Sequence, residues 1–160
     1  MTDKNVSIMN IGSMGYLPQV FKKIENEKKL NIVYLGGSIT MGCNATKTEL
    51  RYVDRSAKWW QTNFPDAEIS YFNAGIGATT SQFGVARVQE HVLDKQPDLV
   101  FVEFSVNDSS SPLFMETYES LVRRLLKAES VKAVVLINNL FYDTGTNAQG
   151  IHNAIGLHYD

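Results

Sequence analysis

Four short apolar runs, separated by segments with helical spacing, constrain the fold of this chain most strongly. The runs are rich in β-branched and aromatic residues and near-continuously apolar, as expected for strands that are covered on both faces. We expect these strands at residues 30–37, 67–75, 98–106 and 132–140. Strands that alternate with helices over short connections form a parallel sheet with helices on both faces. The sequence therefore predicts a doubly wound α/β domain with a parallel sheet.

The segments between the strands carry apolar residues at steps of three and four, which is typical of helices that bury one face. We expect helices over residues 16–29 and 50–64, and three more around 85–92, 114–125 and 148–155. We find no repeat, low-complexity tract or linker, so we expect residues 1–160 to form a single domain.

The C-terminal end of this pattern is unusual. The chain stops after a helix, where one more strand and helix would normally complete such a sheet. We therefore expect a C-terminally incomplete domain that lacks its last strand and helix. Its fourth strand would then be an apolar, unpaired edge, which natural proteins usually avoid. We expect self-association through this exposed strand.

Composition excludes several classes of function. The formal net charge is −2 with a pI near 5.9, so no basic patch indicates nucleic acid or an anionic membrane as a partner. No apolar run approaches the ~20 residues that span a bilayer. The N-terminus lacks the features of a signal peptide, so we expect a cytoplasmic protein as written, or a domain excised from a secreted one. Cys43 is the only cysteine, which excludes an intrachain disulfide, and we expect it to be a buried or semi-buried filler.

Residues that could take part in binding or catalysis lie where three of the strands end. The first strand runs into Gly36, Gly37 and Ser38, the second into Gly75 and Gly77, and the third into Asn107 and Asp108. In a 2-1-3-4 strand order the first strand lies between the other two. Ligands of open α/β sheets bind outside the carboxyl ends of the strands, where the strand order reverses. We therefore expect these three loops to surround one crevice.

Two interpretations of the first loop compete. Gly37 and Gly42 have the spacing of a phosphate loop, but Cys43 and Asn44 follow where that loop needs Lys and Ser or Thr. The interpretation of Ser38 as a nucleophile agrees better with the sequence. Acyl transfer needs an exposed serine oxygen and preorganised donors for the oxyanion. The Ser38 N–H, a glycine N–H of the second loop and the Asn107 amide would supply those donors.

The motifs GGSIT, NAGIGATT and VND, in this order at strands one to three, resemble the SGNH hydrolases, the GDSL-like esterases and lipases. The resemblance implies a three-layer, flavodoxin-like fold, with Ser38 as nucleophile and Gly77 and Asn107 as oxyanion residues. Gly37 replaces the Asp common at its position, and Ser105 replaces a Gly. The family implies short acyl esters, often acetyl groups on sugars, and neither cofactor nor metal.

The catalytic base of that family is missing from its expected place. A histidine with an acid three residues before it should follow near the C-terminus, and no DxxH occurs after Asn107. We expect His91 to be solvated beside Arg87, and we expect the last helix to carry His152 and His158 away from the crevice. A histidine outside this chain would then serve as base, so we expect the 160-residue chain to hydrolyse esters poorly.

The sequence thus predicts a serine-dependent carboxylic ester hydrolase whose substrate is a small-molecule or carbohydrate ester. The alternative is a non-catalytic domain that binds a small molecule or sugar in the same crevice. We expect two acidic residues near the site to have structural roles. Buried Glu103 must be paired or hydrogen-bonded and would brace the loops. Asp108 would either orient a neighbouring loop or hold a turn, and we favour the turn.

Overall fold

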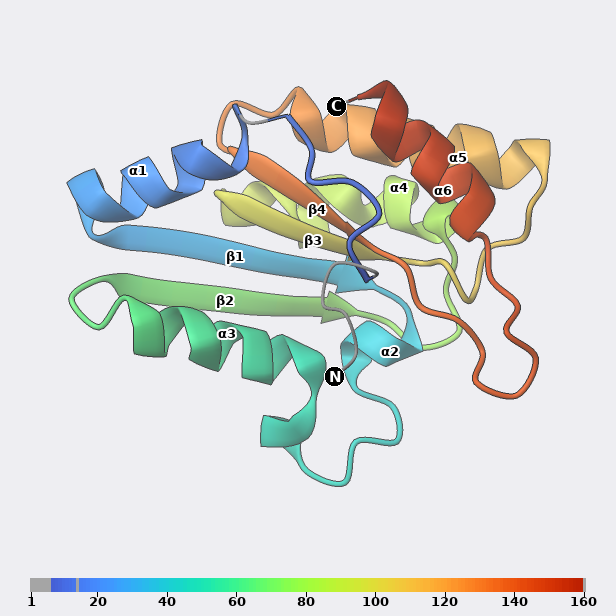
Figure 1. Ribbon diagram of the computed structural model, residues 1–160, viewed down its shortest axis with the longest axis horizontal. Coiled ribbons are helices and arrows are strands. Elements are labelled where there is room, and N and C mark those ends of the chain that lie inside the picture. Colours follow the sequence, from blue (N-terminus) through green and yellow to red (C-terminus); the bar gives the residue numbers. More distant parts are fainter. Residues whose placement is uncertain (1–6, 14, 160) are drawn as a thin grey trace.

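The computed structural model describes residues 7–13 and 15–159. Its centre is a four-stranded parallel sheet in the order β2-β1-β3-β4 (Figure 1). The strands are β1 (Lys29–Gly36), β2 (Glu68–Gly75), β3 (Leu99–Glu103) and β4 (Ala133–Ile137). The predicted strands and their 2-1-3-4 order are confirmed. The register aligns Gly36 of β1 with Gly75 of β2 and Glu103 of β3, so these three strands end side by side.

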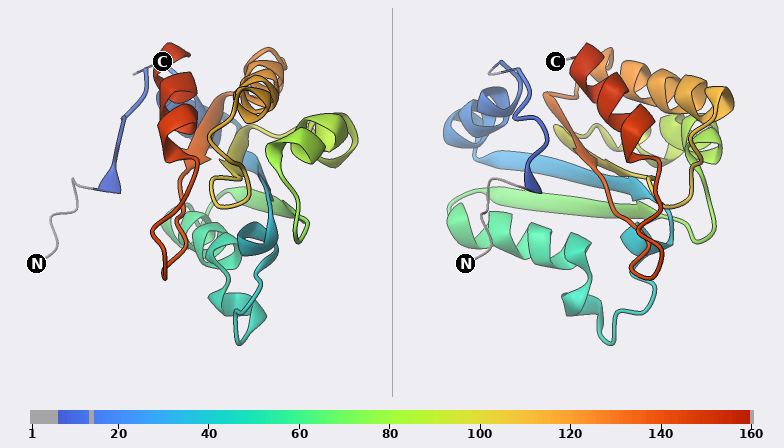
Figure 2. Two further views of the ribbon diagram at one scale, coloured as in Figure 1. Left: turned by 90° about the vertical axis from the view of Figure 1, so that its right-hand side faces the viewer. Right: turned by 45° about the vertical axis from the view of Figure 1, so that its right-hand side comes forward.

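The described residues form six α-helices, and five of them cover the two faces of this sheet (Figures 1 and 2). The six are α1 (Leu17–Glu27), α2 (Ser38–Met41), α3 (Tyr52–Asn63), α4 (Ser81–His91), α5 (Pro112–Leu126) and α6 (Gln149–His158), with 3-10 turns at Thr48–Leu50 and Leu93–Lys95. Helices α1 and α3 pack on one face, while α4, α5 and α6 pack on the other. No helix in the described part of the chain is long and apolar enough to cross a bilayer.

The central strand β1 joins the two halves of the core because its side chains alternate between faces. Ile32 and Tyr34 pack into the cluster under α1 and α3, whereas Val33 and Leu35 pack into the cluster under α4 and α5. All four side chains are fully buried. The prediction of strands covered on both faces is therefore correct for β1.

The prediction is wrong for β2. Tyr71 and Phe72, which point to opposite faces of this strand, are 38% and 42% exposed. β2 has a strand neighbour on one side only and packs mainly against α2 and α3. Its apolar composition therefore reflects an edge strand that is covered incompletely.

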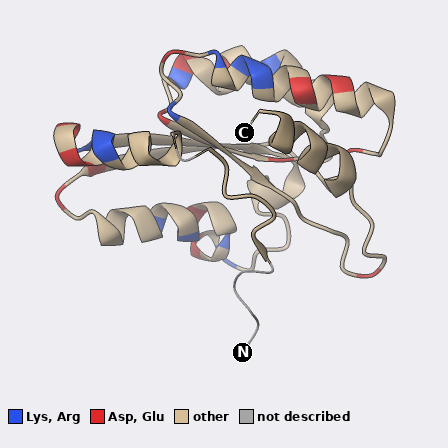
Figure 3. Ribbon diagram, turned by 45° about the horizontal axis from the view of Figure 1, so that its top comes forward, with Lys and Arg blue, Asp and Glu red and all other residues tan. Residues whose placement is uncertain are grey.

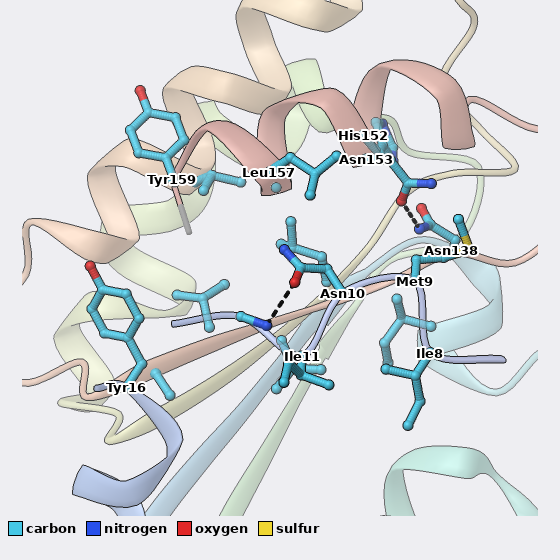
Figure 4. Close-up of a pocket in the computed structure, with 18 of the residues that line it drawn as sticks. Ile8, Met9, Asn10, Ile11, Tyr16, Asn138, His152, Asn153, Leu157 and Tyr159 are labelled. Atoms are coloured by element: carbon cyan, nitrogen blue, oxygen red, sulfur yellow. Dashed lines mark hydrogen bonds between the residues drawn. The ribbon is translucent and has the colours of Figure 1, made fainter. Parts of the chain in front are cut away.

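A groove of about 680 Å³ runs along β4 at the opposite edge of the sheet (Figure 4). Its walls are β4, α6 and residues 7–13, which carry several exposed apolar side chains, among them Ile8, Met9, Ile11 and Leu157. Neither α6 nor residues 7–13 contain a lysine, arginine, aspartate or glutamate, and Figure 3 accordingly shows α6 in tan along its length. This flank is thus apolar and partly uncovered.

Candidate active site

Ser38 is the first residue of α2, directly after the buried glycines that end β1. Gly36 must be a glycine because a Cβ atom there would collide with Thr40 and with the Glu103 carbonyl oxygen. The helix is one turn long and ends at Gly42, whose φ of 100° favours glycine. Ser38 is partly exposed, and neither its N–H nor its Oγ has a hydrogen-bond partner among the described residues.

The loop after β2 is fastened to the back of this short helix. The Asn73 side chain donates to the Thr40 carbonyl at 2.8 Å and accepts from the Gly75 N–H at 2.9 Å. A side chain on Gly75 would collide with the backbone of Met41, so this glycine permits the close approach. Gly77 then lies against the Met41 side chain, and its N–H has no partner in the described part of the chain.

The loop after β3 reaches the same point from the other side. The N–H groups of Asn107 and Asp108 both donate to the Phe104 carbonyl at 2.9 Å, which forms a tight turn. A Cβ atom on Gly37 would lie 2.5 Å from Asn107 Oδ1 and 3.3 Å from the Thr79 carbonyl oxygen. Gly37 is therefore where the three loops meet.

The structure thus brings Ser38, Gly77 and Asn107, the three residues predicted from the motifs, into adjoining loops. Each presents an N–H donor without a partner among the described residues: two backbone amides and the Asn107 side-chain amide. Asn107 Oδ1 is buried and lies beside Gly37, so the oxygen end of this amide is turned into the protein. Free, fixed donors are what an oxyanion requires.

Buried Glu103 supports the first of these loops through its contacts with Gly37 and Thr40, as predicted. Its side chain is fully buried and lies 3.5 Å from the Thr40 hydroxyl, while its carbonyl oxygen accepts the Gly37 N–H at 3.3 Å. Thr40 in turn lies 2.9 Å from the Tyr52 hydroxyl. Burial raises the pKa of Glu103 above its ordinary value, against the opposing effect of hydrogen bonds from Asn139 and Thr40.

Arg87 corrects one prediction. The sequence predicts solvated surroundings beside His91, but Arg87 is only 6% exposed and lies behind the ends of β1 and β2. Its guanidinium donates to the Ala74 carbonyl at 2.7 Å and to the Gly36 carbonyl at 3.1 Å. Burial lowers the pKa of Arg87 to about 10, so it stays charged at neutral pH. No sequence signal distinguished it from a surface arginine.

The histidines differ in their surroundings. His91 is partly exposed and lies 3.2 Å from Arg87, so the expectation of a solvated ring is only partly met. His158 is exposed at the end of α6. His152 is buried, and its Nε2 lies 3.0 Å from Asp108 Oδ2. None of the three is hydrogen-bonded to Ser38.

Asp108 therefore has a different role from the one we favoured. Its backbone takes part in the turn, but its carboxylate accepts the Ser81 N–H at 2.9 Å and pairs with His152. The side chain thus orients neighbouring elements, which was the other alternative. No sequence motif indicates the pair, because its members are 44 residues apart and belong to no local pattern.

Cys43 also corrects a prediction. It is exposed, because the chain leaves α2 through the left-handed Gly42 and Asn44 and passes over the surface. It thus does not fill the core. Among the described residues, no group of three or more His, Cys, Asp or Glu side chains is placed to hold a metal ion.

Comparisons with solved structures agree with this fold. A two-domain esterase active on acetylated mannans superposes with a TM-score of 0.87 at 47% identity, over 94% of this chain. The same enzyme co-crystallised with mannopentaose gives 0.85 at 49% identity, over 91% of this chain. The chain spans 40% of the length of that esterase. An acetylxylan esterase from Geobacillus stearothermophilus shares the fold, with a TM-score of 0.60 at 21% identity over 79% of this chain and 66% of its own.

A comparison with curated proteins gives no match. The family model of the GDSL-like lipases and acylhydrolases, in contrast, matches residues 34–155, which include all three motif loops. The matched region is well over half of the chain. The chain therefore belongs to the GDSL-like lipase/acylhydrolase family.

Proposed function

We propose that this domain hydrolyses carboxylic esters with Ser38 as the nucleophile. The observation that carries the proposal is a set of three donors, in the loops that meet at Gly37, that have no partner among the described residues, together with a serine hydroxyl that has none among them either. Paired donors would have to break existing hydrogen bonds before they served an oxyanion. Unpaired donors held by rigid loops are available at once, and such preorganisation is a large term in acyl transfer.

In the proposed mechanism, Ser38 Oγ attacks the ester carbonyl carbon while a general base takes the hydroxyl proton. The carbonyl oxygen becomes an oxyanion, held by the N–H groups of Ser38 and Gly77 and by the Asn107 amide. Collapse of this intermediate releases the alcohol, which takes the proton, and leaves an acyl-serine. Water then attacks the acyl-serine by the same route and releases the acid.

No described histidine is bonded to Ser38, so the base must come from elsewhere or from a rearrangement. We propose that a histidine outside residues 1–160 supplies it and that the isolated chain turns over slowly. Loss of one member of a serine triad lowers the rate by roughly 10⁴- to 10⁶-fold.

For the substrate we propose short acyl esters of carbohydrates, acetyl esters first. Support comes from the two-domain esterase that is active on acetylated mannans and 47% identical over 94% of this chain. The two sequences share the region that carries the predicted nucleophile and oxyanion residues. Because the chain spans 40% of that enzyme, the sugar specificity is a proposal about this domain alone.

Labelling with a fluorophosphonate probe tests the nucleophile. The probe is applied to the 160-residue chain and to the polypeptide encoded by its natural gene, each alongside a Ser38→Ala variant. We expect the gene product to label at Ser38, and the isolated chain to label at least 100-fold more slowly because it lacks the base. Ser109→Ala, an exposed serine just beyond the Asn107 turn, is the matched control and should label like the wild type.

Two outcomes would contradict the proposal. Labelling that persists in Ser38→Ala would assign the nucleophile to another residue. Absence of labelling in both chains would make Ser38 a turn residue and favour the alternative, a domain that binds a small molecule or sugar in the same crevice. Rapid labelling of the isolated chain would overturn only the proposed dependence on an external base.

A further inference from the structure

We propose that Asp108 and His152 act as a positioning pair for the oxyanion site, holding the loops of Gly77 and Asn107 at a fixed separation. The inference rests on the proposed function and extends it to a residue on α6, far in sequence from the motifs. Asp108 directly follows Asn107, so whatever fixes its carboxylate also fixes the turn that carries the Asn107 amide.

The Asp108 carboxylate divides its two oxygens between two elements. Oδ1 accepts the N–H of Ser81, the first residue of α4, at 2.9 Å, and Oδ2 lies 3.0 Å from His152 Nε2. Thr80, the residue before α4, makes no side-chain cap of its own. Asp108 therefore caps α4 from another loop, with a negative charge at a helix N-terminus, where it is favourable.

This cap determines the position of the second donor. The loop from Gly77 to Thr80 is short, and its far end is the capped N-terminus of α4. Within the loop, only the Thr79 side chain bonds to a neighbouring carbonyl, that of Ile76 at 2.7 Å. The Gly77 N–H is thus held between the end of β2 and Asp108, so movement of the carboxylate would move both the Gly77 and the Asn107 donors.

The surroundings of His152 fix the orientation of its imidazole ring. Its side chain and that of Asp108 are completely buried. The imidazole ring stacks on the Tyr118 ring of α5, with a centroid separation of 3.5 Å and an interplanar angle of 4°. A ring fixed in this way presents Nε2 to Asp108 in one orientation, and its Nδ1 has no partner among the described residues. The pair therefore couples the position of α6 to the oxyanion site.

Other bonds fasten the same turn to the chain segment that leads into α6. The Ser105 hydroxyl bonds both the carbonyl and the N–H of Asn139, at 2.8 and 2.6 Å, and the Ser105 carbonyl accepts the Ala148 N–H at 2.7 Å. These bonds hold the base of the turn. The Asp108–His152 contact holds its tip, where Asn107 lies.

The test compares His152→Phe with three other variants. Phenylalanine keeps a ring against Tyr118 and removes the Nε2 contact, whereas His152→Gln keeps a donor that can reach Asp108. Asp108→Asn keeps the shape of the side chain and the bond to Ser81. His158→Phe, on the exposed end of the same helix, is the matched control.

The first readout is the ¹H–¹⁵N spectrum of the 160-residue chain, which requires no catalysis. We expect His152→Phe to shift the Gly77 backbone and Asn107 side-chain amide signals, and Asp108→Asn to shift the same signals by less. His152→Gln should lie closest to the wild type, and His158→Phe should leave both signals unchanged. Unchanged Gly77 and Asn107 signals in a folded His152→Phe, or in Asp108→Asn where the first variant does not fold, would overturn the proposal.

The second readout is hydrolysis of 4-nitrophenyl acetate by the natural gene product. We expect His152→Phe to lower kcat by about 10- to 100-fold with KM within about twofold, because small displacements of positioned groups have effects of this size. His152→Gln should recover most of the loss. An equal loss in His152→Gln, or a loss confined to KM, would contradict a positioning role. Shifted signals together with turnover that does not depend on Ser38 would retain the positioning pair and reject the proposed function.

Discussion

The two sides of the sheet are built differently. On the β2–β1–β3 side, three loops interlock at Gly37, and buried Glu103, Arg87 and Asp108 bond the backbone that carries them. On the β4 side, an uncharged helix and residues 7–13 leave an apolar groove along a half-buried strand (Figure 4). The proposed oxyanion donors therefore lie on the rigid side, and none of them lines the groove.

The difference shows which parts of the molecule hold the donors. Donors that hold an oxyanion must be rigid, and here the central strands supply that rigidity through close backbone approach and buried polar contacts. A base needs only to reach Ser38 from one direction. Because His152 of α6 contacts Asp108, the two sides of the molecule meet at this pair. Away from the pair, changes on the β4 side should leave the donors in place, and the following predictions test this expectation.

The largest expected effect is on the donor side. Asn107→Ala should lower the rate of fluorophosphonate labelling in the natural gene product by roughly 100- to 1000-fold, because it removes one oxyanion donor. Asn153→Ala, which removes a bond to Asn138 on the β4 side, is the control and should leave the rate within about threefold. Similar losses in the two variants would mean that the donors depend on the β4 side beyond the Asp108–His152 contact.

Two glycines, one at the end of β2 and one in α6, differ in how closely other atoms approach them. Gly75→Ala would place a Cβ atom against the backbone of Met41, so we expect the free energy of unfolding to fall by about 1–3 kcal/mol. Gly150→Ala in α6 meets nothing within 4 Å and should raise it by about 0.5–1 kcal/mol. Urea denaturation measures both. A Gly75→Ala variant as stable as the wild type would show that the loops are not tightly interlocked.

The contribution of buried Glu103 to stability should depend on pH. Because burial raises its pKa in the folded state above the ordinary value of 4.5, the folded protein holds this proton more tightly than the unfolded chain. The stability from this group is fully present below that value and is lost as the pH rises through the folded pKa. We expect stability to fall with rising pH more steeply in the wild type than in Glu103→Gln, as measured by urea denaturation at several pH values. Parallel profiles would place Glu103 in a more polar setting than the structure shows.

The smallest effect should appear on the β4 side. We propose weak self-association through the open edge of β4, which sedimentation velocity would detect as a sedimentation coefficient that rises with concentration. Ile11→Lys and Leu157→Lys place charges on two exposed residues beside the groove and should reduce the rise. Lys58→Ala, remote on α3, is the control. A wild-type coefficient independent of concentration would contradict self-association.

Most of the fold was predictable because its signals are local. Apolar runs, helical spacing and short connections suffice for a parallel sheet with helices on both faces, and the strand ends indicate where a site must lie. Coverage of the strands was less predictable. Tyr71 and Phe72 are as apolar as residues of a central strand, and only the position of β2 at the edge leaves them partly exposed.

By itself, the sequence determined the family, the strands and the three loops that carry Ser38, Gly77 and Asn107, since each is encoded in contiguous stretches of residues. The tertiary structure alone decided how those loops are held. Buried Arg87 behind β1, exposed Cys43 and the Asp108–His152 pair all depend on segments brought together by folding, and burial and pairing of polar groups follow from packing.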